Sequence, residues 1–176
     1  MIDMALKGQG ALGGWLQPGS GWGIPIDELL KTPGFRKPTP EDVAEAKKLL
    51  AEAGYPDGFK FDLFTRGLQM YVDLDIAGMG QLEKLGITAD IKQYETAAFQ
   101  ERMLGHDFSA MFYGLASREL PDPDQLLSGY LKDSPSNYGL YYNPEYDALF
   151  QKQSQATDPA ERKKLVLDAE KLLLKD

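Results

Sequence analysis

The sequence predicts an α/β fold in which a parallel or mixed sheet is flanked by helices. Three runs with strand character, 59–64, 87–94 and 108–115, alternate with two runs of helical periodicity, 69–85 and 96–104. The first strand alternates apolar and polar residues, the mark of a strand with one face on a core. Helical crossovers of this length join parallel strands, so the strands are predicted to pair in parallel.

A helix with both ends marked leads into the first strand. Thr39 suits the N-cap, and Pro40 suits the first helical position because its missing N–H would have no partner there. Gly54 fits the left-handed residue after a helix, and residues 55–58 favour a turn. The predicted helix presents an apolar stripe formed by Val43, Ala46, Leu49, Leu50 and Ala53.

The two helices between the strands are each expected to pack through one face. In 69–85 that face holds Val72, Ile76, Met79 and Leu82, and Gly86 ends the helix. In the shorter helix Thr96 is expected to be the N-cap, with Phe99 and Met103 on one face and Gly105 at the end.

Three further helices are predicted after the third strand, each opened by an N-cap residue followed by proline. The pairs are Asp122-Pro123, Asn143-Pro144 and Asp158-Pro159. The last helix continues to Asp176 without a C-cap, and residues 1–7 read as the end of an earlier helix. We therefore expect a chain truncated at both ends.

Residues 1–38 are rich in glycine, proline and tryptophan, and they predict an irregular segment with a helix remnant at its start. Residues 39–176 form the α/β lobe, within a single domain overall. The irregular segment contains a literal GxGxxG at residues 8–13. Dinucleotide binding requires a strand before this motif and a helix after it, and neither is predicted. An irregular loop is therefore the preferred interpretation.

Composition narrows the function further. The chain has 176 residues, a net charge of −8 and no cysteine, and its basic residues form no stripe. Nucleic acid is therefore excluded as an expected partner, and no cofactor or metal site is indicated. No apolar run approaches the roughly 20 residues that span a bilayer. The first residues lack the basic and apolar regions of a signal peptide.

Candidate catalytic groups have simpler explanations. Asp122 and Asp124 stand at a predicted helix start, where carboxylates serve as caps and complement the helix dipole. His106 follows a helix-ending glycine and is expected to be a surface turn residue. Ser109 and Ser117 lie in no nucleophile motif. The sequence therefore favours a protein that is not an enzyme.

Several segments resemble one known family. AEAKKLLAEAGYPDGF, residues 44–59, looks like a segment of the extracytoplasmic solute-binding proteins of the oligopeptide and dipeptide class, family 5, which serve ABC importers. Other patterns resemble that family in the same order along the chain: residues 81–87, 107–108, 122–124, 137–139, 142–149 and 157–173.

The resemblance implies one lobe, the second, of a two-lobed protein with a type II periplasmic-binding-protein-like fold. It implies peptide or other small polar solute as ligand, the missing first lobe of the same protein and an ABC permease in the membrane as partners, and a periplasmic or extracytoplasmic location. Sugar and opine-like ligands remain open.

The resemblance also places the ligand at the loop after the third strand. Tyr113 stands where the family commonly has a tryptophan, and Glu119 takes the place of an aspartate that pairs with a peptide's ammonium group. Arg118 favours an anionic group on the ligand. Amphipathic aromatic and amide side chains suit a polar-solute cleft. The expected ligand-binding residues are Trp15, Tyr113, Arg118, Glu119, Asn137 and Tyr138.

Two alternatives remain from the sequence. The sheet and the carboxylates would also suit a small α/β hydrolase or transferase. An independent interaction domain is the third reading, which predicts natural chain ends at Met1 and Asp176.

Overall fold

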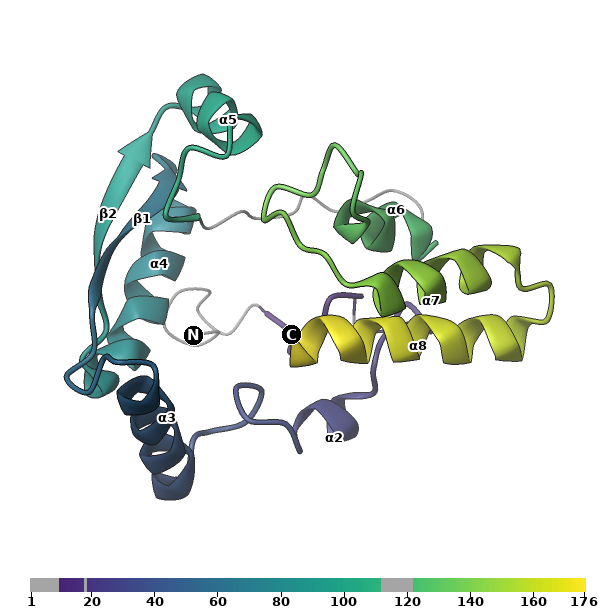
Figure 1. The fold of residues 1–176 in the computed structure, drawn as a ribbon, viewed down its shortest axis with the longest axis horizontal. Coiled ribbons are helices and arrows are strands. Elements are labelled where there is room, and N and C mark those ends of the chain that lie inside the picture. Colours follow the sequence, from purple (N-terminus) through teal and green to yellow (C-terminus); the bar gives the residue numbers. More distant parts are fainter. Residues whose placement is uncertain (1–9, 18, 112–121) are drawn as a thin grey trace. The chain divides into compact units, whose positions relative to one another are not determined.

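The computed structural model describes residues 10–17, 19–111 and 122–176 (Figure 1). The chain divides into two compact units, one of residues 1–10 and 37–115 and the other of residues 11–36 and 116–176. The domain division expected from the sequence, 1–38 and 39–176, stays a prediction. The predicted strand in 112–115 and the helix remnant in 1–7 lie outside the described residues.

The first unit contains a parallel three-stranded sheet. Its strands are β1 (Lys60–Arg66), β2 (Thr88–Tyr94) and β3 (Ala110–Met111), in the order β2-β1-β3. Both neighbours of β1 run parallel to it, with Arg66 opposite Tyr94 in register with β2. The predicted parallel pairing is therefore confirmed, and the central strand is the first in sequence.

Helices α4 (Gln69–Leu82) and α5 (Thr96–Leu104) cover opposite faces of this sheet. Thr65 of β1 lies beside Asp75 of α4, whereas its neighbour Phe64 contacts Arg102 of α5. Successive side chains of a strand point to opposite faces, so each helix packs on its own face. A short 3-10 helix, η1 (Glu83–Leu85), continues α4 into β2.

The buried face of α4 differs from the predicted one. Val72 is buried as expected, but Ile76 is 57% exposed, and the other buried positions of the helix are Asp75 and Ala77. In α5 the buried Phe99 and Met103 confirm the predicted face. The expected N-cap Thr96 was wrong by one residue, because Glu95 is the N-cap and makes no side-chain capping bond.

Helix α3 (Pro40–Glu52) begins as the sequence predicts. The Thr39 hydroxyl accepts the Asp42 N–H, and the Asp42 carboxylate accepts the Thr39 N–H, which completes a capping box. None of its residues is buried, and Leu49 of the predicted apolar stripe is 55% exposed. The helix is thus fixed by its ends more than by its packing.

The turn after α3 packs backbone against backbone. Gly58 and Gly86 have φ angles of +82° and +77°, which favour glycine. A Cβ on Gly86 would lie 2.2 Å from the Asp57 carbonyl oxygen, and one on Gly58 would lie 2.2 Å from the Gly86 carbonyl. Two segments that resemble the family in sequence are therefore joined by a contact that only glycine permits.

The described part of the second unit is helical. It comprises α2 (Ile26–Leu29), α6 (Asp124–Leu127), η2 (Ser128–Tyr130), α7 (Pro144–Gln155) and α8 (Pro159–Lys175). Asn143 and Asp158 cap α7 and α8 as predicted, each accepting N–H groups of the first turn. The expected N-cap Asp122 was wrong by one residue, because helix α6 starts at Asp124 with Pro123 at the N-cap, although Asp122 accepts the Asp124 N–H at 2.9 Å.

One apolar core holds this unit together. It joins α7 and α8 to the glycine-rich segment that precedes α2, through Leu16, Leu127, Tyr146, Phe150, Val166 and Ala169. The buried Tyr146 hydroxyl donates to the Leu127 carbonyl at 2.7 Å, so the ring fills the core without leaving its polar atom unpaired. Across the described ranges, every helix is too short or too polar to cross a bilayer.

Candidate functional site

The carboxyl ends of parallel strands are the usual place for a ligand in an open α/β sheet, at the point where the strand order reverses. In the order β2-β1-β3 that point lies beside β1, because the chain crosses to β2 on one side and to β3 on the other. Arg66 is the last residue of β1. The structure therefore draws attention to an arginine that the sequence analysis did not select.

Two aromatic rings hold the Arg66 side chain. Its Cζ atom lies 4.3 Å from the ring centroid of Tyr71 and 5.9 Å from that of Phe99. Arg66 Nη2 also donates to the Tyr71 hydroxyl. Tyr71 lies in the first turn of α4 and Phe99 near the start of α5, so the rings come from helices on opposite faces of the sheet. They meet the guanidinium where β1 ends.

Most of the Arg66 donors are available to a ligand. A guanidinium has five N–H groups, and Tyr71 accepts from one nitrogen only. Within the described ranges Arg66 is half-buried and has no carboxylate partner, and none of its nitrogens is both buried and unpaired. A guanidinium held in this way matches the two oxygens of a carboxylate.

One of the two helix starts at this edge of the sheet, that of α4, also favours an anion. Neither α4 nor α5 has a side-chain cap or an acidic residue in its first turn. Helices α3, α7 and α8 each have both. A helix N-terminus carries partial positive charge, but the N-cap of α5 is Glu95, whose carboxylate opposes an anion. The start of α4, with Leu68 at its N-cap, is the one that adds to the field of Arg66.

Three of the ligand-binding residues expected from the sequence, Tyr113, Arg118 and Glu119, lie outside the described residues. Their role stays a prediction. The described strand that precedes them, β3, runs parallel to β1, with Met111 opposite Phe64.

Trp15, another expected binding residue, belongs to the second unit. Its exposed ring packs against Tyr130 with a centroid separation of 4.9 Å and an interplanar angle of 59°. The contact fixes the indole and leaves part of its surface exposed. A ligand could contact this surface, and the ring could equally serve to anchor the loop. Its role in binding stays a prediction.

Asn137 is engaged within its own loop. Only 6% of the residue is exposed, and its amide donates to the carbonyls of Leu131 and Tyr141 and accepts the Tyr141 N–H. These bonds close the segment that carries Tyr138, which is half-buried. The geometry gives Asn137 a structural part in shaping the loop, and contact of either residue with ligand stays a prediction.

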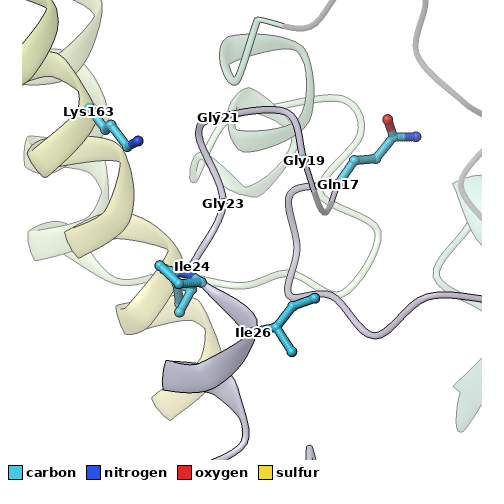
Figure 2. A pocket seen from close by; sticks show the side chains of 8 residues that line it. Gln17, Gly19, Gly21, Gly23, Ile24, Ile26 and Lys163 are labelled. Carbon is cyan, nitrogen blue, oxygen red and sulfur yellow. The ribbon is translucent and has the colours of Figure 1, made fainter.

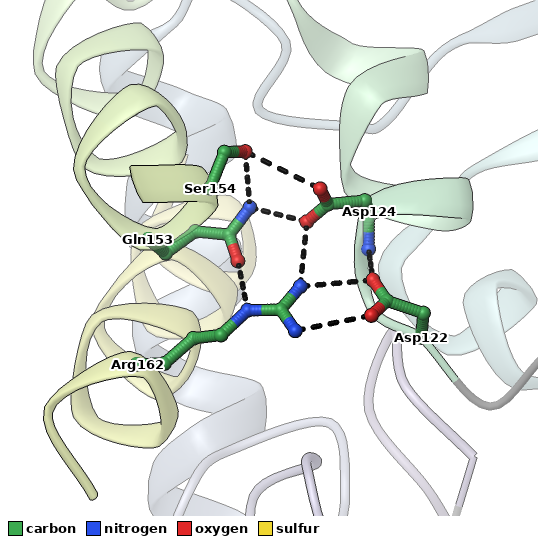
Figure 3. Close-up of polar contacts among 5 residues, drawn as sticks. All are labelled: Asp122, Asp124, Gln153, Ser154 and Arg162. Atoms are coloured by element: carbon green, nitrogen blue, oxygen red, sulfur yellow. Dashed lines mark hydrogen bonds and ion pairs between the residues drawn. The ribbon is translucent and has the colours of Figure 1, made fainter. Parts of the chain in front are cut away.

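Asp122 and Asp124 form an ion-pair network with Arg162 of α8 (Figure 3). Arg162 donates to both Asp122 oxygens at 3.0 and 2.9 Å and to Asp124 at 3.2 Å. Gln153 bridges Arg162 and Asp124. The Arg162 hydrogen bonds hold the pKa of Asp122 below its usual range. A carboxylate kept ionised by a bidentate partner joins helices and is unsuited to act as a general acid.

The glycine-rich loop binds a carboxylate of its own chain. Glu170 of α8 is fully buried, and its two oxygens accept the N–H groups of Leu16 and Ile24 at 2.9 and 2.8 Å. A Cβ on Gly14 would lie 2.4 Å from Glu170 Oε1, so the loop passes close to this side chain. The N–H groups that bind this carboxylate come from residues after the GxGxxG, whose Gly8 and Gln9 lie outside the described residues.

A shallow pocket of about 220 Å³ opens beside this loop (Figure 2). Ile24 and Ile26 supply its apolar surface, and Gln17 and Lys163 supply its polar side chains. None of the described ligand-binding candidates lines it. His106 is exposed in a turn at φ +54°, as expected for a surface residue. The described residues contain no group of His, Cys, Asp and Glu suited to a metal ion.

Comparison with known proteins gives a consistent result. Residues 2–138 match the family model described as bacterial extracellular solute-binding proteins, family 5 middle. Heme-binding protein A of Haemophilus influenzae is 33% identical over 139 residues, which are 74% of this chain and 25% of that protein. Di/tripeptide-binding protein 1 of Pseudomonas aeruginosa is 28% identical over 181 residues, 98% of this chain and 32% of that protein.

The fold is also found among solved structures. A dipeptide-binding protein from a Pseudoalteromonas species, in complex with Met-Leu, superposes with a TM-score of 0.77 and 26% identity over 99% of this chain and 34% of that one. The predicted α/β class, with the parallel sheet and flanking helices of type II periplasmic binding proteins, is confirmed. The chain spans no more than about a third of these relatives' length. By sequence and by fold, it belongs to the bacterial extracellular solute-binding proteins, family 5.

Proposed function

We propose that this chain is one lobe of a solute-binding protein that delivers a carboxylate-bearing solute, a peptide in the first instance, to an ABC permease. Arg66 at the carboxyl end of β1 is the observation that carries the ligand class, because its half-buried guanidinium is held by two rings and has no carboxylate partner among the described residues. The name of the di/tripeptide-binding relative, which matches 98% of this chain, supports peptide as the solute.

The rest of the binding protein supplies the other half of the site in this proposal. The matched share of the relatives, 25% and 32%, leaves room for a second lobe that closes on the solute. Hinged closure around a ligand requires contacts from both lobes, and the closed form is what a permease would recognise. The protein would act outside the cytoplasm, where an importer collects its solute.

Binding without chemistry fits the described residues better than a hydrolase or transferase. The most suggestive acidic pair, Asp122 and Asp124, is committed to Arg162. The relatives named above are binding proteins as well. We therefore propose that the protein has no enzymatic activity, which a turnover screen with Asp122→Asn as a control would test.

Calorimetry on the full-length protein would test the proposed function. Panels of peptides, sugars and opine-like solutes are titrated in turn, and saturable binding of peptides is expected. Failure to bind any of these classes would count against a solute-binding role. The present chain alone is expected to bind the same ligand far more weakly, and equal affinity would contradict a site shared between lobes.

A further inference from the structure

We propose that Tyr71 is a positioning residue that makes the Arg66 site distinguish a carboxylate from an amide. The inference rests on the proposed function and adds a residue and a selectivity that the function does not require. Binding of a solute needs only affinity, whereas discrimination between two planar groups of the same size needs a guanidinium held in one orientation.

The contacts of Arg66 show how that orientation is fixed. An unrestrained arginine side chain has rotamer freedom worth about 2 kcal/mol. Tyr71 limits it in two ways, since its hydroxyl accepts from Nη2 and its ring lies under the guanidinium at 4.3 Å. Phe99 is fully buried and limits movement toward α5. Of these partners, only Tyr71 supplies a directional bond.

The orientation determines what the remaining donors bind. With Nη2 engaged by Tyr71, the plane of the guanidinium keeps one orientation at the end of β1, and so do its other N–H groups. A carboxylate offers two acceptor oxygens to two parallel N–H groups. An amide offers one oxygen and places its NH₂ group against a donor. A fixed guanidinium therefore penalises the amide, whereas a mobile one moves to accept its single oxygen.

The test compares a peptide with a free carboxyl end and the same peptide with an amidated end, by calorimetry on the full-length protein. In the unaltered protein the acid is expected to bind at least tenfold more tightly. Tyr71→Phe keeps the ring and removes the acceptor, so it should lower this acid-to-amide ratio about three- to tenfold, the range of one hydrogen bond. Affinity for the amide should change less than twofold.

Two further variants complete the design. Tyr71→Leu removes ring and hydroxyl and should lower the ratio more than Tyr71→Phe does. Tyr55→Phe removes an equivalent hydroxyl from an exposed tyrosine of the same unit, whose ring packs at a tilt against Phe59, and it should leave the ratio unchanged. A ratio unaffected by Tyr71→Phe, or an equal loss for acid and amide, would overturn the positioning role.

The outcomes separate this inference from the proposed function. If the protein binds peptides without preferring the acid, the proposed function stands and the positioning role of Tyr71 is refuted. If the protein binds no solute, both the proposed function and the positioning role of Tyr71 are refuted.

Discussion

Two buried carboxylates have opposite surroundings, and they should respond oppositely to neutralisation. Glu170 accepts two backbone N–H groups, whereas Asp75 is 4% exposed and its Oδ2 has no hydrogen-bond partner among the described residues. Burial raises the pKa of Asp75, and the adjacent Thr65 hydroxyl offsets the rise in part without meeting hydrogen-bond geometry. Burial also raises the pKa of Glu170, although the backbone N–H groups that it accepts offset part of the rise. Charge is therefore costly at both positions, but only at position 170 do hydrogen bonds to both oxygens compensate for it.

Asp75→Asn is expected to raise the free energy of unfolding at pH 7 by about 1 kcal/mol, the order of relieving one buried unpaired charge. A raised pKa means that the native state holds its proton more tightly than the unfolded chain. The wild-type contribution is thus fully present below the ordinary pKa of 3.8 and is lost as pH rises through the native value. Urea unfolding of both proteins from pH 4 to pH 7 would show the difference growing with pH.

Thr65→Val is the matched control for that series. The substitution removes the other unpaired oxygen of this site, keeps nearly the same side-chain shape and introduces no titratable group. Because the Thr65 hydroxyl lowers the pKa of Asp75, its removal should make the variant progressively less stable than the wild type as pH rises, opposite in sign to Asp75→Asn. If the difference in unfolding free energy between Asp75→Asn and the wild type did not change with pH, the charge on Asp75 would not be destabilising the fold.

Glu170→Gln should lower the free energy of unfolding by about 1–3 kcal/mol, because its NH₂ group would face the N–H of Leu16 or Ile24. Gly14→Ala should destabilise by a similar amount, since its Cβ would fall 2.4 Å from an oxygen that is already fixed. Denaturant unfolding monitored by tryptophan fluorescence would report both. Unchanged midpoints would contradict the role assigned to Glu170.

At the scale of elements, two glycines near the end of α4 should behave in opposite ways. Gly80 lies within the helix, with ordinary φ and no atom within 4 Å of the place where a Cβ would stand, so Gly80→Ala should stabilise by about 0.5–1 kcal/mol. Gly86 has φ +77° and contacts the Asp57 carbonyl, so Gly86→Ala should destabilise by more than that. Thermal unfolding of the two variants checks both signs, and equal shifts would contradict the packing of turn 55–58.

The sequence was most informative where local chemistry decides the structure. The caps at Thr39, Asn143 and Asp158 were predictable because an N-cap, a proline and acidic residues stand together in the chain. The buried face of α4 was not, since a helix with apolar residues on several sides does not reveal which side its neighbour covers. Ile76 is exposed and Asp75 buried for that reason.

The Arg66 site was out of reach of the sequence for a related reason. Arg66, Tyr71 and Phe99 come together only once the strand order and the faces of α4 and α5 are known. Its one local signal was an arginine followed by glycine just after the predicted strand. The sequence offered even less indication that Glu170 is buried, because a glutamate on an amphipathic helix is ordinarily exposed.

At the scale of the whole molecule, membership of family 5 and the parallel sheet were both predicted from ordered segments of the chain. The ligand-binding residues chosen from the resemblance, Tyr113, Arg118 and Glu119, stay a prediction because they lie outside the described residues. The proposed ligand class therefore depends on Arg66, and substitution of that arginine tests it.

The decisive measurement is the affinity of the full-length protein for a peptide with a free carboxyl end, before and after Arg66→Met. A loss of about 10- to 100-fold is expected, the range of charged hydrogen bonds. Lys84→Met removes the same charge from the opposite end of the sheet, where η1 leads into β2, and should change affinity less than twofold. Unchanged binding by Arg66→Met, or equal losses in both variants, would contradict a carboxylate site at the end of β1.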